Sequence, residues 1–212
     1  MRSNLSKRIS EKLYGFRSLK FWEERYREGG NSGDGSYGRL AHFKAEVLNH
    51  FIDENKIQSI AELGCGDGNQ LSLIAYRKYL GLDVSETVIR HCAEKFKMDS
   101  AKSFILYKPG IFFNSGFIQA DLSISLDVVF HLVEEEIYNQ YLTDLFSLSD
   151  KFVIIYSTNF DKKETTHILH RAFLTDIQNR FSGWTLLKKI PNIFPGNGLG
   201  ESLSDFFFFI KR

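Results

Sequence analysis

The chain has 212 residues, 43% of them hydrophobic, which is enough to build one full core in a single domain. The 27 basic and 26 acidic residues leave a net charge of +1, which gives no support to a general nucleic-acid or membrane-surface binder. No apolar run is long enough for a membrane span, and the charged N-terminus does not read as a secretory signal. Two cysteines are too few for a disulfide framework or a zinc site, so we expect a cytoplasmic protein without a resident metal.

Two short helices are predicted at the N-terminus, on either side of a break at Gly15. Their apolar residues recur at helical spacing: Leu5, Ile9, Leu13, Phe21, Trp22 and Tyr26. Many Lys and Arg surround them, which favours a solvated cap over a partner-binding helix. The Gly-rich segment 29–38 follows, and it is either a linker or a lid that folds over a site. We therefore expect a helical cap and lid loop over residues 1–37 and the main domain over residues 38–212.

Beyond the lid loop, apolar strands alternate with helices. A long amphipathic helix covers residues 40–52. Strands are predicted at Ile57–Leu63, Lys78–Leu82, Ser103–Tyr107, Ala120–Leu126 and Phe152–Ser157, with helices at Gly68–Tyr76, Ser85–Phe96 and Glu134–Leu148. Such alternation predicts a parallel sheet with helices on both faces.

The pattern changes after Ser157. A helix is predicted over His167–Phe181, and Trp184–Ile190 and Asp205–Lys211 resemble two strands joined by a loop rich in Pro and Gly. The run Phe206–Phe209 favours a strand that is buried on both faces.

The most informative segment is the turn from the first predicted strand into the next helix. Gly64 and Gly66 allow the backbone to approach a ligand closely, and the helix that follows would direct its N–H groups at that ligand, with Asp67 as its cap. Asp83 lies 19 residues after Gly64, at the tip of the second strand. Its carboxylate could accept both ribose hydroxyls of an adenosine.

Residues 62–68 and 81–85 together resemble the class I S-adenosylmethionine-dependent methyltransferases. The run from Leu126 to Leu132, an acid among apolar residues that continues into His131, is similar to that family as well. The resemblance covers roughly residues 38–160 well and the rest loosely. It implies a Rossmann-like α/β fold with a seven-stranded, mostly parallel sheet and a final antiparallel hairpin. Within the family, the chain is similar to enzymes found with bacterial surface-polysaccharide synthesis.

The resemblance implies S-adenosyl-L-methionine as the cofactor. The residues expected to hold it are Glu62, Gly64, Cys65, Gly66, Gly68, Asn69, Asp83, Val84, Leu126, Tyr37 and Arg39. Tyr37 could cover the methionine and Arg39 could meet a carboxylate, or both could be structural. The family often has an acid at the tip of the third strand for the adenine, and this chain has none. Asp99, Tyr107, a backbone group, or stacking alone could replace it.

His131 is the first candidate for a general base, because an imidazole that follows the fourth strand should face the ligand crevice. It could equally satisfy a helix end or pack in the core. A second candidate group is His167, His170 and Arg171, whose spacing would place them on one helix face. Arg171 could grip a carboxylate or phosphate, or the group could be a solvated helix face. No further ligand at a telling spacing supports a metal site.

These residues favour methyl transfer to a small polar acceptor, such as the hydroxyl of a sugar, without nucleic-acid partners. A nicotinamide-dependent oxidoreductase is a second hypothesis, against which the G-x-G-x-G spacing and the closing hairpin count. A non-catalytic module of the same fold is a third.

Overall fold

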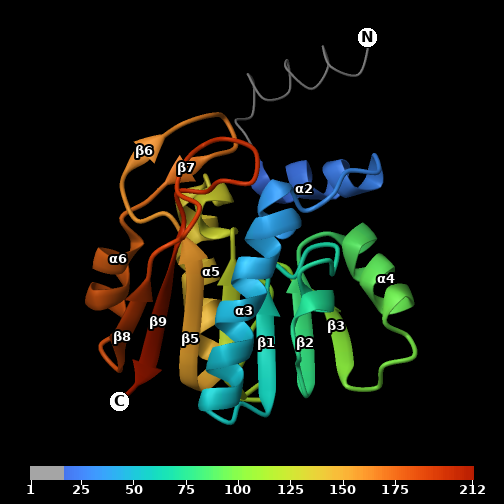
Figure 1. The fold of residues 1–212 in the computed structure, drawn as a ribbon, viewed down its shortest axis with the longest axis horizontal. Coiled ribbons are helices and arrows are strands. Elements are labelled where there is room, and N and C mark those ends of the chain that lie inside the picture. The colour runs from blue at the N-terminus through green and yellow to red at the C-terminus, as the bar shows by residue number, and fades with distance from the viewer. Residues whose placement is uncertain (1–16) are drawn as a thin grey trace.

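The computed structural model describes residues 17–212, so the first predicted helix, with Leu5, Ile9 and Leu13, lies outside the described residues. The described part has a seven-stranded sheet with the order β3-β2-β1-β4-β5-β9-β8 (Figure 1). The strands are β1 (Ser59–Leu63), β2 (Lys78–Asp83), β3 (Lys102–Leu106), β4 (Ala120–Leu126), β5 (Ser149–Ser157), β8 (Trp184–Ile190) and β9 (Asp205–Lys211). Strands β1 to β5 are parallel, and β9 is antiparallel to both β5 and β8. The predicted fold class is confirmed, including the final antiparallel hairpin.

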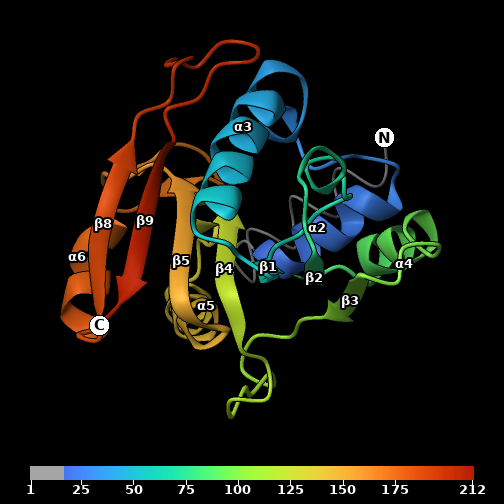
Figure 2. The ribbon, with the colours of Figure 1, turned by 60° about the horizontal axis from the view of Figure 1, so that its bottom comes forward.

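Helices cover both faces of the sheet, which is what a parallel sheet of apolar strands requires. One face carries α3 (Gly38–Glu54) and α4 (Glu86–Lys95), and the other carries α5 (Glu135–Ser147) and α6 (Phe173–Arg180) (Figure 2). Helix α2 (Ser18–Arg27) and a small hairpin of β6 (Lys162–Lys163) and β7 (Leu169–His170) lie at the edge where the parallel strands end. This edge is where ligands bind in open α/β sheets.

Strand β9 shows how the sheet divides the core into two layers. Phe207 and Phe209 pack in the cluster that holds α5 and α6, whereas Phe206 and Phe208 pack in the cluster that holds α3. All four side chains are at most 1% exposed. The prediction of a strand buried on both faces is therefore confirmed.

The helix predicted over Gly68–Tyr76 is wrong. The structure has only a single 3-10 turn at Leu71–Leu73, and the chain becomes extended at Ile74. The cause is Asn49 of α3, whose side chain donates to Leu73 O at 3.2 Å and accepts from Ala75 N at 2.9 Å. These bonds satisfy backbone groups that a helix would otherwise pair internally. The expected helix terminus aimed at a ligand is therefore absent from this described segment.

The helix predicted over His167–Phe181 is also wrong in its first half. Leu169 and His170 form β7, which pairs with β6, and the helix begins only at Phe173. Backbone N–H groups near the helix start are bonded by side chains that follow β5: Asp161 accepts from Ala172 N at 2.9 Å and Asn159 from Leu174 N at 3.0 Å. His167, His170 and Arg171 consequently do not share a helix face.

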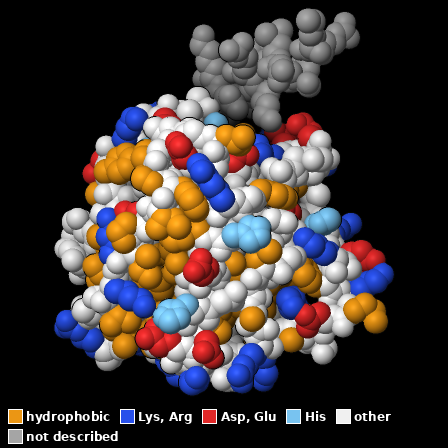
Figure 3. Space-filling view, viewed as in Figure 1, with side chains coloured by type: hydrophobic (Ala, Val, Ile, Leu, Met, Phe, Trp, Pro, Cys, Tyr) orange, Lys and Arg blue, Asp and Glu red, His pale blue; other side chains and the backbone are white. Residues whose placement is uncertain are grey.

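The surface carries charges of both signs. On the face seen in Figure 3, Lys and Arg are interspersed with Asp and Glu. Within residues 17–212, no helix combines the length and the apolar character that crossing a bilayer requires.

Candidate functional site

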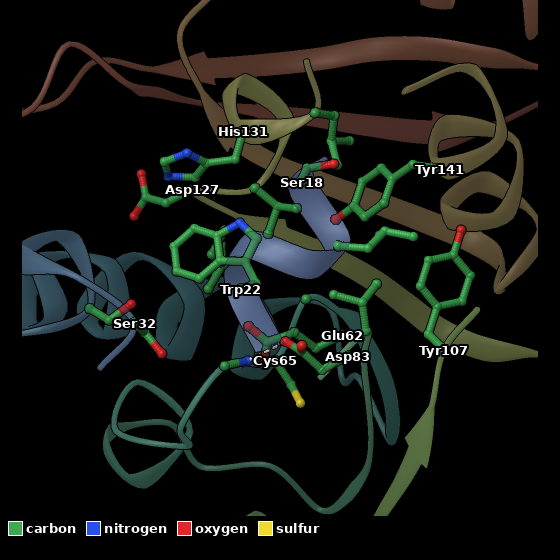
Figure 4. A pocket seen from close by; sticks show the side chains of 18 of the residues that line it. Ser18, Trp22, Ser32, Glu62, Cys65, Asp83, Tyr107, Asp127, His131 and Tyr141 are labelled. Atoms are coloured by element: carbon green, nitrogen blue, oxygen red, sulfur yellow. Dashed lines mark hydrogen bonds between the residues drawn. The ribbon is translucent and has the colours of Figure 1, made fainter. Parts of the chain in front are cut away.

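A cavity lies where the carboxyl ends of β1 and β4 diverge (Figure 4). This is the point at which the strand order reverses, where ligands of doubly wound sheets bind. Helix α2 lies over the cavity and contributes part of its lining. Residues that line it include Ser18, Leu19, Trp22, Tyr26, Ser32, Glu62, Gly64, Cys65, Gly66, Asp83, Val84, Tyr107, Leu126, Asp127, Val128, His131 and Tyr141.

The Gly loop, residues 64–68, forms the floor of the cavity. Gly64 and Gly66 have φ angles of +86° and +58°, a region that residues with a Cβ rarely adopt. A Cβ on Gly64 would lie 2.5 Å from Val128 Cγ2, and one on Gly66 would collide with Ser32 Oγ. Both positions therefore require glycine, as the sequence predicts.

Asp83 lies at the end of β2, 6% exposed, and lines the cavity. Its Oδ2 accepts from Gly66 N at 3.0 Å and its Oδ1 from Ser85 N at 3.0 Å. Burial raises the pKa of Asp83 to about 6, against the effect of these N–H donors. A carboxylate has about four lone-pair positions, so it can accept from ligand hydroxyls in addition to these backbone N–H groups.

Glu62 and Cys65 lie deeper in the floor. Glu62 is 2% exposed and accepts from Tyr79 Oη at 2.6 Å, and burial raises its pKa to about 7. Two effects raise the pKa of the Cys65 thiol well above its usual value. The larger is its hydrogen bond with Cys92, and the second is its burial. Cys65 is thus a small wall residue and not a nucleophile.

Residues 28–37 connect α2 to α3 and contain most of the segment 29–38 that was predicted as a lid or a linker; we call residues 28–37 the lid segment after the first of these possibilities. The lid segment is fastened to the Gly loop through Asp67. The Asp67 carboxylate accepts from Ser32 N and from Tyr37 Oη, both at 2.8 Å. Burial alone would raise the pKa of Asp67, but these donors and Asn69 N hold it below its usual value. Asn69 Nδ2 in turn donates to Ser36 O at 2.7 Å. Asp67 therefore anchors the lid segment, where the sequence predicted a helix cap.

Several predicted cofactor residues lie outside the lining of the cavity. Gly68 and Asn69 shape the Gly loop, and Tyr37 holds the lid segment. Arg39 donates to Gly200 O at 2.6 Å and lies over the Phe194 ring at 4.7 Å, so it fixes the β8–β9 loop. Tyr37 and Arg39 thus make contacts within the protein, which agrees with the structural role that the sequence left open for them beside a ligand contact.

Helix α2 spans the cavity between two anchors, a role that its amphipathic pattern did not reveal. At one end, Ser18 donates from N and Oγ to the Glu134 carboxylate at 2.8 and 2.6 Å. At the other, the Glu23 carboxylate accepts from Ser85 Oγ at 2.6 Å and Thr87 Oγ1 at 2.7 Å. Trp22, between the anchors, lines the cavity. The apolar stripe of this helix is therefore the roof of the site.

His131 lies at the cavity wall, and its ring meets the edge of the Trp22 ring at a centroid distance of 4.9 Å (Figure 4). Its Nδ1 is 3.1 Å from the backbone oxygen of His167. Because a carbonyl can only accept, Nδ1 carries the proton and Nε2 keeps its lone pair. Burial lowers the pKa of His131 to about 4, so the ring is neutral at physiological pH. The unprotonated Nε2 is the proton acceptor of this ring, and the lowered pKa makes it a weaker base than an exposed imidazole.

The other predicted catalytic residues have different surroundings. His170 is 6% exposed and its ring bridges Thr158 Oγ1 at 2.7 Å and Glu164 Oε2 at 3.1 Å. Arg171 donates to Glu135 Oε2 at 2.7 Å, and so joins the chain after β7 to α5. His167 contributes its backbone oxygen to His131. None of the three lines the cavity.

The structure shows which of the residues proposed to contact the adenine can reach the cavity. Asp99 lies in the turn before β3, at the opposite edge of the sheet, where it pairs with Lys102. Tyr107 follows β3, lines the cavity and donates from Oη to Asp144 Oδ2 at 2.6 Å. Asp99 is therefore excluded, whereas Tyr107 stays a candidate.

No protein-family profile and no curated protein matches the sequence. Solved structures match at the level of fold. Magnesium protoporphyrin IX methyltransferase from Synechocystis, with bound S-adenosylmethionine, is 14% identical at a TM-score of 0.64, covering 94% of this chain and 99% of that one. N-methyltransferase NodS from Bradyrhizobium japonicum, with S-adenosyl-L-homocysteine, is 15% identical at a TM-score of 0.64, covering 82% and 86%. A small RNA methyltransferase is 16% identical at a TM-score of 0.61, covering 83% of this chain and 26% of that longer one.

These similarities agree with the strand order and with the cavity at the strand switch point. Their identities are too low to transfer an acceptor. The chain has the Rossmann-like fold of the class I methyltransferases.

Proposed function

We propose that this protein transfers a methyl group from S-adenosylmethionine to a hydroxyl of a small polar acceptor. The observation that carries the proposal is one cavity that brings together the Gly loop, Asp83 and a neutral His131. A sugar or related metabolite is the acceptor class we favour.

The residues present fit this cofactor. The close approach that Gly64 and Gly66 permit suits the backbone contacts that a nucleoside needs, and Asp83 retains acceptor capacity for ribose hydroxyls. Beside Asp83, Val84 and Tyr107 offer an apolar and aromatic wall for an adenine. The bound cofactor would supply an electrophilic methyl group on sulfur.

The protein's own part is positioning and proton removal. Holding an acceptor in line with the methyl group can contribute about 7–11 kcal/mol. Nε2 of His131 would take the hydroxyl proton as the new bond forms. Helix α2 and the lid segment lie over the cavity and would exclude water from the reacting atoms.

The roofed cavity favours a small acceptor over a nucleic acid, and the mixed surface charge seen in Figure 3 agrees with this. The RNA methyltransferase among the similar structures keeps the alternative open to test. Incubation with labelled S-adenosylmethionine and panels of sugars, sugar nucleotides and short RNAs, read by mass spectrometry, tests the proposal. We expect a gain of one methyl group on a small acceptor. Methylation of RNA alone would contradict the acceptor class.

Cofactor affinity should depend on Asp83. Charge-assisted hydrogen bonds contribute about 1.5–3 kcal/mol, so Asp83→Ala should weaken S-adenosylhomocysteine at least about tenfold by calorimetry. Asp99→Ala, at the far edge of the sheet, is the control and should leave affinity unchanged. In the wild type, affinity should fall as the pH is lowered through about 6, where Asp83 becomes protonated. Equal affinity of Asp83→Ala and the wild type for S-adenosylhomocysteine would contradict the assignment of Asp83 as the residue that binds the ribose.

The lid segment should be protected from hydrogen exchange by the cofactor. Asp67 fastens it through Ser32 and Tyr37, so Asp67→Ala should speed exchange over residues 28–37 and weaken S-adenosylhomocysteine several-fold. Asp53→Ala on the exposed end of α3 is the matched control. Exchange that is the same in all states would show that the segment is only a linker.

A further inference from the structure

Residues 107–119, which connect β3 to β4, cross the sheet without a helix, although connections between parallel strands usually contain one. All of them lie in the part of the chain that the structure describes. The connection starts at Tyr107 in the cavity wall, and its middle projects from the body of the molecule (Figure 2). Over residues 100–120 the sequence has Lys102 and Lys108 but no Asp or Glu. The connection is therefore a largely apolar segment in a stretch whose only charges are positive.

Three large apolar side chains of this connection are exposed to solvent. Ile111, Phe113 and Phe117 are 78%, 86% and 96% exposed, and we call these three residues the apolar tip. Single exposed apolar residues are common on protein surfaces, but three within seven positions mark a surface that binds a partner. Covering them would remove apolar area from water, which is favourable.

Inward-facing side chains hold the backbone that carries the apolar tip. Asn114 Nδ2 donates to Ile118 O at 2.9 Å and to Ser147 O at 2.8 Å, and Asn114 Oδ1 accepts from Ile118 N at 3.0 Å. Phe112 packs on the Tyr107 ring at a centroid distance of 5.4 Å, and Ile118 packs against the buried core. The side chains of the apolar tip therefore face solvent from a segment that is fixed to the protein.

A groove beside the apolar tip carries positive charge. It lies over the amino ends of β1, β2 and β3 and reaches Ile118, the neighbour of Phe117 in the chain. Arg77 and Lys78 line the groove and are exposed, and none of the described residues in its lining is acidic. The net charge of +1 for the whole chain does not reveal this local excess, which attracts anionic groups.

The size of the apolar tip favours a lipid over a protein partner. A Phe side chain buries about 150–250 Å², so the two at the tip, even with Ile111 added, fall short of the about 800 Å² that each partner buries in a stable protein interface. A lipid surface needs less contact area, because apolar side chains enter the boundary of headgroups and acyl chains while neighbouring Lys and Arg meet anionic headgroups.

We propose that the apolar tip, together with Arg77 and Lys78, binds the surface of an anionic lipid membrane. The apolar side chains enter the lipid, and the two cations contact the headgroup phosphates. The bond from Asn114 to Ser147, at the end of α5, places the tip near the amino ends of the strands, whereas the cavity lies at their carboxyl ends. Lipid binding therefore leaves the cavity free, and it is independent of methyl transfer.

Co-sedimentation of the full chain with lipid vesicles tests this surface. The protein should bind vesicles of equal parts phosphatidylcholine and phosphatidylglycerol about tenfold more tightly than vesicles of phosphatidylcholine alone. Raising the salt from about 0.1 M to about 1 M shortens the Debye length from about 10 Å to about 3 Å and should release most of the bound protein.

Phe113→Ser/Phe117→Ser removes the aromatic part of the apolar tip and should weaken binding to the anionic vesicles at least about tenfold. Ile193→Ser/Leu199→Ser, which changes two exposed apolar residues of the β8–β9 loop, is the matched control and should bind as the wild type does. All four side chains are exposed, so thermal unfolding should show that both variants remain folded.

Two further variants test the ionic part and the insertion. Arg77→Gln/Lys78→Gln should lose the preference for anionic vesicles, whereas Lys162→Gln/Lys163→Gln, on the exposed β6–β7 hairpin, should keep it. Phe117→Trp should bind as the wild type does, and its added fluorescence should shift to shorter wavelengths on anionic vesicles and be quenched by brominated lipid. The wild type, with its own two tryptophans, gives the baseline.

Three results would overturn the assignment of this surface to anionic lipid. The first is a wild type that does not bind anionic vesicles at low salt, and the second is full binding by Phe113→Ser/Phe117→Ser. The third is a wild-type dimer, seen by sedimentation velocity, that this variant loses, because it would assign the apolar tip to a second copy of the chain. Calorimetry with S-adenosylhomocysteine should give the same affinity in every variant, so loss of lipid binding stays distinct from loss of the cavity.

Discussion

His131→Asn is expected to lower the single-turnover rate of methyl transfer by roughly 10²- to 10⁴-fold, the usual contribution of a general base. Cofactor affinity should stay within about a factor of two, because a base acts on the acceptor proton and not on the cofactor. Asparagine keeps a donor near the backbone oxygen of His167, which limits damage to packing. His91→Asn, on the exposed surface of α4, is the matched control.

The pH profile gives a second readout of the same residue. A base works only when unprotonated, and burial lowers the pKa of His131 to about 4. The wild-type rate should therefore be constant near neutrality and fall as the pH drops through about 4, and His131→Asn should lose that limb. A variant that keeps most of its activity would show that another group removes the proton.

Gly66→Val is expected to abolish cofactor binding. Its φ of +58° is strained for a branched residue, and the new Cβ would collide with Ser32 Oγ, where the lid segment meets the Gly loop. Calorimetry with S-adenosylhomocysteine should show no measurable heat, a larger loss than for any polar substitution in the site.

Gly183→Val is the matched control for this substitution. A Cβ at Gly183 meets no atom within 4 Å, so the same change should leave binding intact. Circular dichroism and thermal unfolding of both variants would separate loss of the site from loss of the fold. Normal binding by a folded Gly66→Val would mean that the Gly loop does not approach the ligand.

The strands could be predicted from the sequence because burial on both faces leaves continuous apolar runs. Strand β9, with Phe206 to Phe209, is the clearest example. Two helices were wrongly predicted because contacts with residues distant in the sequence determine the local structure there. Asn49 supplies the hydrogen bonds that keep residues 73–75 out of a helix, and pairing of β7 with β6 does the same for Leu169 and His170.

The site divides in the same way. Gly64, Gly66 and Asp83 could be predicted because local backbone geometry and strand ends fix their places. Asp127, which lines the cavity, forms an ion pair with Lys44, 83 positions earlier in the chain, and no local pattern marks this pair. The position of Trp22 over the cavity also could not be predicted, because it depends on hydrogen bonds from both ends of α2 to residues that are distant in the sequence.

Calorimetric titration of the purified protein with S-adenosylhomocysteine and, separately, with NAD tests the central claim most directly. A Gly loop with this spacing, an Asp at the end of β2 and the fold of the class I methyltransferases predict saturable binding of S-adenosylhomocysteine, with one molecule per chain, and no heat with NAD. Binding of NAD without binding of S-adenosylhomocysteine would contradict the account and favour an oxidoreductase.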